Sequence, residues 1–471
     1  MKRNDMGDIP HNIRKVAFYL LSLLVILFVY LSYIQVVESN FLGSHPLNRR
    51  NAEATHHVEN GMIIDKNGEK LAYSKKNGDS FKREYPYAAI TANVVGYDSF
   101  KYGSTGIEST FNNYLTGMNN QLRHLGAISH LFSNQPGNNV LLTIDAKIQE
   151  AAYRELGENR GAIVVIVPRT GAILAMVSKP SFNPNTLDQQ WEQISSASTS
   201  PLLNRATQGL YPPGSVIKVM MADAALSEKI TDMNTTIHCE GALTVPPDYI
   251  LEESGHVAHG NLNLEQALAV SCNVTFGTLA LKLGDNKMAK TFDRYGFKRP
   301  IGSELQEVES YLPDINSLAN GDLAQLGIGQ GSLLVTPLRM AMLVSTFANK
   351  GIIMKPYIVN RITDFNGQTI KEFKPEEWLT PTSSQLADII SNMMVTVVNK
   401  GTGSGARLAG IKVAGKTGTA ENAHGASHAW FIGFAPADNP EVAIAVIVEN
   451  AGSGGSIAAP IAGRILALAL H

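Results

Sequence analysis

The chain lacks an excess of charge of either sign and has almost no cysteine. Its 471 residues include 39 Lys and Arg against 41 Asp and Glu, for a formal net charge of −2. Binding to a nucleic acid depends on clustered positive charge, and no basic tract interleaved with aromatics occurs. We therefore expect no nucleic acid partner. Cys239 and Cys272 are too few for a disulfide framework, and the sequence leaves open whether they pair or fill the core.

Long hydrophobic runs are also scarce, because only residues 16–37 form one that can span a bilayer. As a helix this run would extend roughly 33 Å. The basic residues that precede it predict a cytoplasmic tail at 1–15 and an extracytoplasmic remainder. A cleaved signal peptide is the alternative. The run is longer than a signal core and no small-x-small site follows it, which favours a retained single-pass anchor at the cell membrane.

The remainder divides into two units. Residues 38–155 resemble a strand-rich module, with a short apolar strand and an Asn-Gly turn signal at 61–68 and glycine punctuation before a helix-like stretch at 102–117. No nucleophile stands near a base in this module. We expect it to be a non-catalytic pedestal that positions residues 156–471.

Strand patterns at both ends of the second unit enclose a largely helical middle. A helix is expected over 145–156, followed by a hairpin, and the chain ends with three strands and a helix at 458–470. The expected hairpin strands are 162–167 and 172–178, and the expected late strands are 411–420, 429–435 and 442–448. Distant segments must then share one antiparallel sheet with helices on its faces, which is an α+β architecture.

The first chemical motif is Ser215-x-x-Lys218, within YPPGSVIK. The two prolines stop a preceding helix, Gly214 permits a tight turn, and an apolar helix is expected over 216–227. Ser215 is a candidate nucleophile, and Lys218, one turn away, is its candidate base. The bare tetrapeptide is a weak signal that also fits a capping serine. Its Pro-Pro-Gly lead-in and apolar helix favour the catalytic interpretation.

The second motif is Ser271-Cys272-Asn273 at the end of an apolar helical run. Ser271 can relay a proton and Asn273 can hold a substrate backbone, although a helix-ending turn explains the same pattern. Ser181-Phe182-Asn183 matches the tripeptide too, so the pattern alone is not decisive.

The third motif is Lys416-Thr417-Gly418-Thr419, in a strand-like stretch. Glycine within a strand marks a close approach, so a peptide can add along this edge. Lys416, Thr417 and Thr419 can then bind a carboxylate, and the N–H groups of Thr419 and Ser215 can form an oxyanion hole. We expect the pKa of Lys218 to be lowered by burial and by Lys416.

Metal is not expected. The histidine pairs lack carboxylate or cysteine neighbours at ligand spacing in the sequence (His56 and His57, His256 and His259, His424 and His428).

With these motifs in this order behind an anchor, the chain resembles the class B penicillin-binding proteins, which are monofunctional transpeptidases. The resemblance covers nearly the whole chain after the anchor and is closest to the branch called penicillin-binding protein A. It rests on the three motifs, on residues 47–50 (LNRR), 65–68 (DKNG) and 102–108 (YGSTGIE), and on 327–341, 400–403, 413–421 and 428–436. The chain departs from the family's usual Arg-Gly at Asn60-Gly61.

The resemblance implies a five-stranded antiparallel sheet flanked by helices, and a D,D-transpeptidase that needs no cofactor. Ser215 would attack a stem peptide ending in D-Ala-D-Ala, Lys218 would take its proton, and Ser271 would pass a proton to the leaving D-Ala. β-Lactams should acylate Ser215. The resemblance also implies a polytopic SEDS-type glycan polymerase as partner.

Several alternatives stay open. A D,D-carboxypeptidase differs only in using water as the acceptor. A β-lactamase or β-lactam sensor shares two motifs, but no matching deacylation base or additional membrane span is evident. A non-catalytic scaffold would form no penicillin adduct.

Overall fold

The computed structural model describes residues 9–36, 38, 59–78, 80–117, 136–422 and 425–470. Residues 47–50, His56, His57 and His424 lie outside this part. The described helices are α1 Ile9–Val36, α4 Ala92–Val95, α5 Gly106–Thr110, α6 Asn112–Leu115, α7 Ala146–Glu155, α8 Leu187–Ser195, α9 Arg205–Gln208, α10 Lys218–Ser227, α11 Leu264–Val270, α12 Asn273–Arg294, α13 Asn320–Gly327, α14 Pro337–Ala348, α15 Ser384–Lys400 and α16 Ala458–Ala469.

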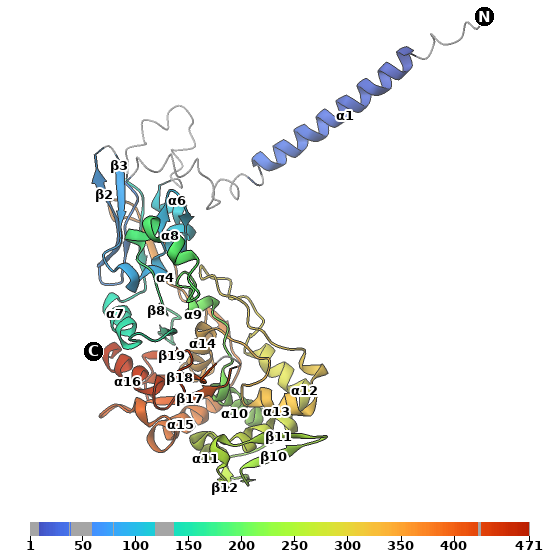
Figure 1. The fold of residues 1–471 in the computed structure, drawn as a ribbon, viewed down its shortest axis with the longest axis vertical. Helices are drawn as coiled ribbons and strands as arrows, with labels where there is room; N and C mark the ends of the chain where they lie inside the picture. Colours follow the sequence, from blue (N-terminus) through green and yellow to red (C-terminus); the bar gives the residue numbers. More distant parts are fainter. Residues whose placement is uncertain are drawn as a thin grey trace, which may run out of the picture.

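The strands are β1 Ile63–Ile64, β2 Lys70–Asn77, β3 Ser80–Glu84, β4 Asp98–Ser99, β5 Gly103–Ser104, β6 Asn139–Leu142, β7 Gly161–Ile166, β8 Ile173–Lys179, β9 Thr236–Cys239, β10 Ala242–Val245, β11 Tyr249–Glu252, β12 Gly260–Asn263, β13 Ile353–Met354, β14 Val359–Thr363, β15 Thr369–Glu372, β16 Glu377–Leu379, β17 Ala414–Ala420, β18 His428–Ala435 and β19 Val442–Val448. Figure 1 shows their arrangement.

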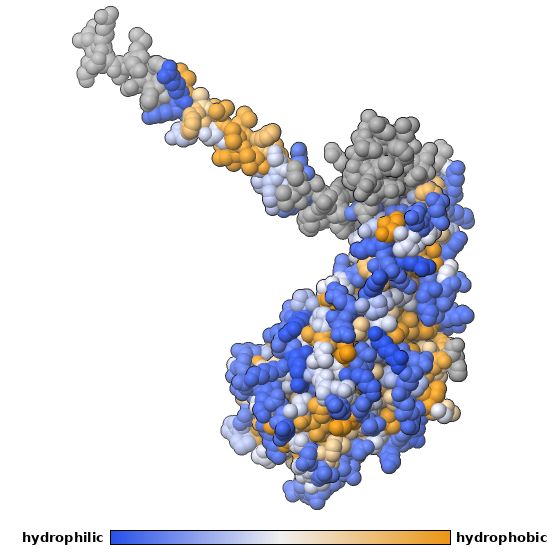
Figure 2. Space-filling view, turned by 180° about the vertical axis from the view of Figure 1, so that it is seen from behind, coloured by the Kyte–Doolittle hydropathy of each residue, from blue (hydrophilic) through white to orange (hydrophobic). Residues whose placement is uncertain are grey.

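The predicted apolar helix is present as α1. Its segment Ile13–Gln35 has a mean hydropathy of 2.3 and none of it is buried against other parts of the chain. Figure 2 shows this helix as a hydrophobic surface. Its length and composition suffice to cross a bilayer, while its orientation there stays a prediction.

The predicted antiparallel sheet has five strands in the order β17-β18-β19-β7-β8. The hairpin β7–β8 forms around the expected Pro/Gly turn, and β19 pairs with β7, which joins the two ends of the catalytic sequence. The α+β prediction is confirmed.

Both faces of this sheet are covered by helices. In β19, Ala445 and Ile447 share one core cluster with residues of α14, whereas Ile444 and Val446 share another with residues of α16. Since both faces of the sheet are buried, the central strands β7 and β19 are continuously apolar rather than alternating. The β17 strand, which carries the third motif, is left at one edge.

The strand-rich module contains a second sheet, with the order β15-β14-β6-β1-β2-β3. Two of its strands, β14 and β15, come from the sequence region that we assigned to catalysis, so the module is completed by a distant segment. A buried ion pair of 2.7 Å between Arg83 and Glu108 ties β3 to α5, and Arg83 also donates to the carbonyl oxygen of Gly61 at 2.8 Å. The boundary at residue 155 stays a prediction.

Candidate active site

Ser215 lies on a tight turn that begins a buried helix. Residues Gly214–Ile217 form a 3-10 turn, and α10 follows from Lys218. We predicted one helix over 216–227, whereas in the structure the 3-10 turn precedes an α-helix that begins at Lys218. Gly214 has φ +55°, which favours glycine, and its N–H donates to the carbonyl oxygen of Gly329 at 2.8 Å. The turn therefore presents a half-buried Ser215 from a fixed backbone.

Lys218 is completely buried, which is rare for a lysine. Its Nζ donates to the carbonyl oxygen of Ser271 and to Oδ1 of Asn273, both at 2.6 Å, and lies 3.4 Å from Oγ of Ser271. In the described part of the chain no hydrogen bond joins Ser215 to Lys218. Burial lowers the pKa of Lys218 to about 8, against the opposing influence of Glu253 and Cys272. The predicted direction is confirmed.

Ser271 adopts a left-handed conformation, with φ 64° and ψ 37°, where α11 ends. Asn273 then starts α12, and its Nδ2 donates to the carbonyl oxygen of Glu252 at 2.9 Å. The turn between the two helices therefore holds both side chains of the second motif beside Lys218.

Lys416 of β17 is the second fully buried lysine of the site. Its Nζ donates to Oγ of Ser271 and to the carbonyl oxygen of Thr417, both at 2.9 Å. Burial lowers its pKa well below the ordinary value, and repulsion from Lys218 lowers it further. The expected repulsion between the two lysines is present, and it disfavours the state in which both amines are protonated. Their side chains meet at the hydroxyl of Ser271.

Gly418 has a packing role that the sequence did not reveal. A Cβ atom there would lie 3.0 Å from the carbonyl oxygen of Pro213 and 3.0 Å from Cγ1 of Val216. A Cβ on Gly214 would in turn lie 3.0 Å from the carbonyl oxygen of Thr419. The glycine therefore lets the turn that carries Ser215 lie directly against the strand, in addition to any role in admitting substrate.

The threonines of the third motif differ in exposure. Thr417 is buried and its hydroxyl lies 2.6 Å from that of Thr402, whereas Thr419 is exposed and accepts from the N–H of Gly454 at 3.4 Å. The structure thus brings together all three predicted motifs.

The tripeptide Ser181-Phe182-Asn183, which matches the second motif in sequence and is called the decoy tripeptide below, lies elsewhere and has structural contacts. The hydroxyl of Ser181 donates to the carbonyl oxygen of Ala89 at 2.8 Å, and Asn183 caps a short turn at Pro184–Thr186. These contacts explain the residues without catalysis.

We expected His256 and His259 to lack carboxylate neighbours at ligand spacing, but the structure places a carboxylate near each of them. Nδ1 of His256 lies 3.7 Å from Glu252, and Nε2 of His259 lies 3.8 Å from Glu253. A short 3-10 turn at Ser254–His256 lies between β11 and β12, so these contacts are local in sequence.

The sequence did not indicate the contacts that support the turn carrying Ser215. The hydroxyl of Tyr211 donates to Glu449 at 2.7 Å, and Glu449 accepts a second bond of 2.7 Å from Arg205. The indole of Trp430 donates to the carbonyl oxygen of Pro212 at 3.0 Å. Glu449 follows β19, far along the chain, so no local motif indicated it.

The fold and this site define a class of serine acyltransferase, and the comparisons with known proteins agree. Residues 161–467 match the model of the penicillin binding protein transpeptidase domain, and residues 60–140 match that of the penicillin binding protein A dimerisation domain. The chain belongs to the penicillin-binding protein transpeptidase family.

Among its relatives, the peptidoglycan D,D-transpeptidase PbpA of Mycolicibacterium smegmatis is 34% identical, over 98% of this chain and 99% of that protein. MrdA of Acinetobacter baumannii, also named a peptidoglycan D,D-transpeptidase, is 32% identical over 80% of this chain and 64% of its own length. The ceftriaxone acyl-enzyme of penicillin-binding protein A from M. tuberculosis has a TM-score of 0.83 at 31% identity, covering 89% of this chain and all of that one.

Proposed function

We propose that this chain is a peptidoglycan D,D-transpeptidase that works through an acyl-enzyme on Ser215. The observation that carries the proposal is the meeting of two buried lysines, Lys218 and Lys416, at the hydroxyl of Ser271. Burying a charged lysine without a counter-charge reduces stability. Lysines with a lowered pKa next to a hydroxyl are typical of catalytic sites. Relatives of nearly the same length carry the same activity in their names.

Acylation begins when neutral Lys218 accepts the proton of the Ser215 hydroxyl. Oγ of Ser215 then attacks the carbonyl carbon of the penultimate D-Ala, and a C–O bond forms. The N–H groups of Ser215 and Thr419 stabilise the oxyanion, which is supported by the direct packing of the 213–215 segment on residues 418–420. As the C–N bond breaks, the proton passes from Lys218 through Ser271 to the leaving nitrogen, and D-Ala departs.

Substrate binding uses the free edge of β17. A stem peptide adds as a strand along this edge, and Asn273 holds its backbone. Lys416, with the hydroxyls of Thr417 and Thr419, binds the terminal carboxylate. Burial lowers the pKa of Lys416, and an incoming carboxylate acts in the opposite direction by favouring the protonated amine.

The second half reaction transfers the acyl group to an amine of a neighbouring stem peptide, which forms the cross-link and frees Ser215. A β-lactam mimics the dipeptide but leaves no departing group, so its adduct persists. The acyl-enzyme structures of a relative with ceftriaxone and with imipenem are consistent with this outcome.

We further propose that α1 is a retained anchor, with a cytoplasmic tail at 1–15 and residues 38–155 as pedestal. The length and hydropathy of α1 and the basic residues before it support this topology. Family resemblance supports a SEDS-type polymerase as the partner of the anchor and pedestal.

The proposed activity is tested by product analysis with a synthetic stem peptide ending in D-Ala-D-Ala. With an acceptor amine, we expect D-Ala release together with the amide-linked product. Ser215→Ala should remove both, and Ser181→Ala should retain both. D-Ala release into water alone, unchanged by any acceptor, would identify a carboxypeptidase instead.

A further inference from the structure

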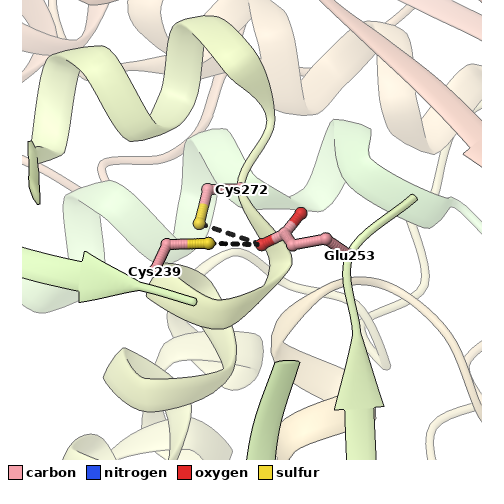
Figure 3. Close-up of side chains that lie close together, drawn as sticks. All are labelled: Cys239, Glu253 and Cys272. Carbon is pink, nitrogen blue, oxygen red and sulfur yellow. Dashed lines mark hydrogen bonds between the residues drawn. The ribbon is translucent and has the colours of Figure 1, made fainter. Parts of the chain in front are cut away.

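Four potential metal donors meet behind the second catalytic motif. Cys239, Glu253 and Cys272 are all buried, and their donor atoms lie within 4.8 Å of one another. Figure 3 shows both thiols directed at the same carboxylate oxygen of Glu253. The distances to Oε1 are 3.0 Å from Sγ of Cys272 and 3.6 Å from Sγ of Cys239. Nε2 of His259 lies 3.8 Å from the other oxygen, Oε2.

The separations between Glu253 and the other three donors, from 3.0 to 3.8 Å, are close to those of a tetrahedral zinc site. Zinc bonds to nitrogen, oxygen and sulfur of about 2.0–2.3 Å place neighbouring donors about 3.3–3.8 Å apart. Thiolate and imidazole donors select zinc over the oxygen-seeking cations, so the mixed set is more typical of zinc than of calcium or magnesium.

The surroundings supply a second, independent reason. The side chain of Glu253 is only 3% exposed, and among the described residues His259 is the one basic side chain with an atom within 4 Å of its carboxylate. A buried carboxylate is costly without a full counter-charge. Backbone N–H groups also stabilise negative charge here, since Val274 donates to Glu253 at 2.7 Å and Thr275 donates to Sγ of Cys272 at 3.3 Å.

The four residues come from four separate segments. Cys239 ends β9 and pairs with Gly260, the neighbour of His259, while Glu253 follows β11 and Cys272 caps α12. The sheets β9–β12 and β10–β11 have only two strands each, and such ribbons are marginally stable alone. A metal would join both ribbons to the turn that carries Ser271 and Asn273.

We propose that Cys239, Glu253, His259 and Cys272 bind one zinc ion, which fixes the catalytic 271–273 turn to the neighbouring ribbons. The two thiols lose their protons on binding, so the bound ion is coordinated by two thiolates, a carboxylate and an imidazole. His259, which is 21% exposed, lies on the solvent side and provides the entry path. This role is structural and runs against our expectation from the sequence that the chain binds no metal.

The test uses the full chain in detergent, purified without chelators or a histidine tag. We expect one zinc per chain by elemental analysis and two titratable thiols after denaturation in the presence of a chelator. Removal of zinc should lower the melting temperature, and cobalt substitution should give thiolate-to-cobalt charge-transfer absorption.

Variants assign the donors. His259→Ala should weaken zinc affinity at least about tenfold, since even outer partners of a metal site commonly contribute that much. His256→Ala is the matched control, because this histidine is exposed and contacts Glu252 instead. Cys239→Ser should remove the charge-transfer contribution of one thiolate.

Two results on the wild-type chain would overturn the proposal, even if a variant fails to fold. One is the absence of free thiols, which would mean a Cys239–Cys272 disulfide. The other is two free thiols with no zinc bound, even after zinc is added. Ser215→Ala should hold as much zinc as the wild type. The zinc proposal and the acyl-enzyme proposal are therefore tested independently of each other.

Discussion

The side-chain nitrogen of Lys416 lies 2.9 Å from the hydroxyl oxygen of Ser271, which also lies 3.4 Å from the nitrogen of Lys218. One hydroxyl therefore links two buried amines that repel each other when both are protonated. In the proposed mechanism, Ser271 is therefore the group through which a proton leaves Lys218.

Ser271→Ala should slow acylation about 10²–10⁴-fold, the usual range for loss of a proton-transfer group. The loss should appear in the rate of acylation by a stem peptide, measured by single-turnover kinetics. Ser181→Ala, the matched change in the decoy tripeptide, should leave the rate unchanged. Equal acylation rates for the two variants would show that Ser271 takes no part in proton transfer.

The pH dependence of acylation should follow the Lys218 amine. Only its neutral form accepts a proton, and its pKa is about 8, so the rate should rise through that pH and level off above it. Lys416, Glu253 and Cys272 are the ionisable groups that influence this amine. Lys218→Arg should abolish acylation, since a guanidinium does not deprotonate at these values. A profile that is flat between about pH 6 and 10 would contradict the role of Lys218.

Gly329→Ala should displace the nucleophile turn. Gly329 has φ +77°, and a Cβ there would lie 2.1 Å from the carbonyl oxygen of Gly214. Gly367→Ala is the control, because this glycine has φ +87° with nothing within 4 Å of its Cβ position. Both variants bear a backbone cost of about 1–2 kcal/mol, but only Gly329→Ala should lose most penicillin labelling. Similar labelling of the two would show that the turn tolerates the clash.

Glu449→Gln should destabilise the fold because it leaves Arg205 without its carboxylate partner. The guanidinium is only 1% exposed, and breaking a buried pair of this kind commonly costs about 3–5 kcal/mol. Asp438→Asn, which breaks the exposed pair with Lys412, should cost at most about 1 kcal/mol. Urea unfolding of the full chain measures the loss of unfolding free energy in each variant. Equal midpoints would mean that Glu449 contributes little.

Much of the fold followed from patterns that are local in sequence. The β7–β8 hairpin and the apolar β19 have strong signals of their own, and the buried helix after Ser215 was evident from its continuous apolar run. The pairing of β6 with β14 was not predictable, because Leu142 meets Val359 across a long separation and neither strand carries a marker of its partner.

The three candidate motifs could be recognised in the sequence, since each is a short string whose residues stay together. Glu449 and the Cys239–Glu253–Cys272 group were not, because their members come from separate segments and meet only in the folded chain. The role of Gly418 was only partly predicted, because its contact with Pro213 depends on the placement of the nucleophile turn.

The most direct test of the central claim is to identify the residue that penicillin acylates. We expect mass spectrometry of the digested adduct to place the label on Ser215, with an adduct that lasts for hours and is absent from Ser215→Ala. A label on any other residue, or a rapidly hydrolysed adduct, would contradict the assignment of Ser215 as the nucleophile of a transpeptidase.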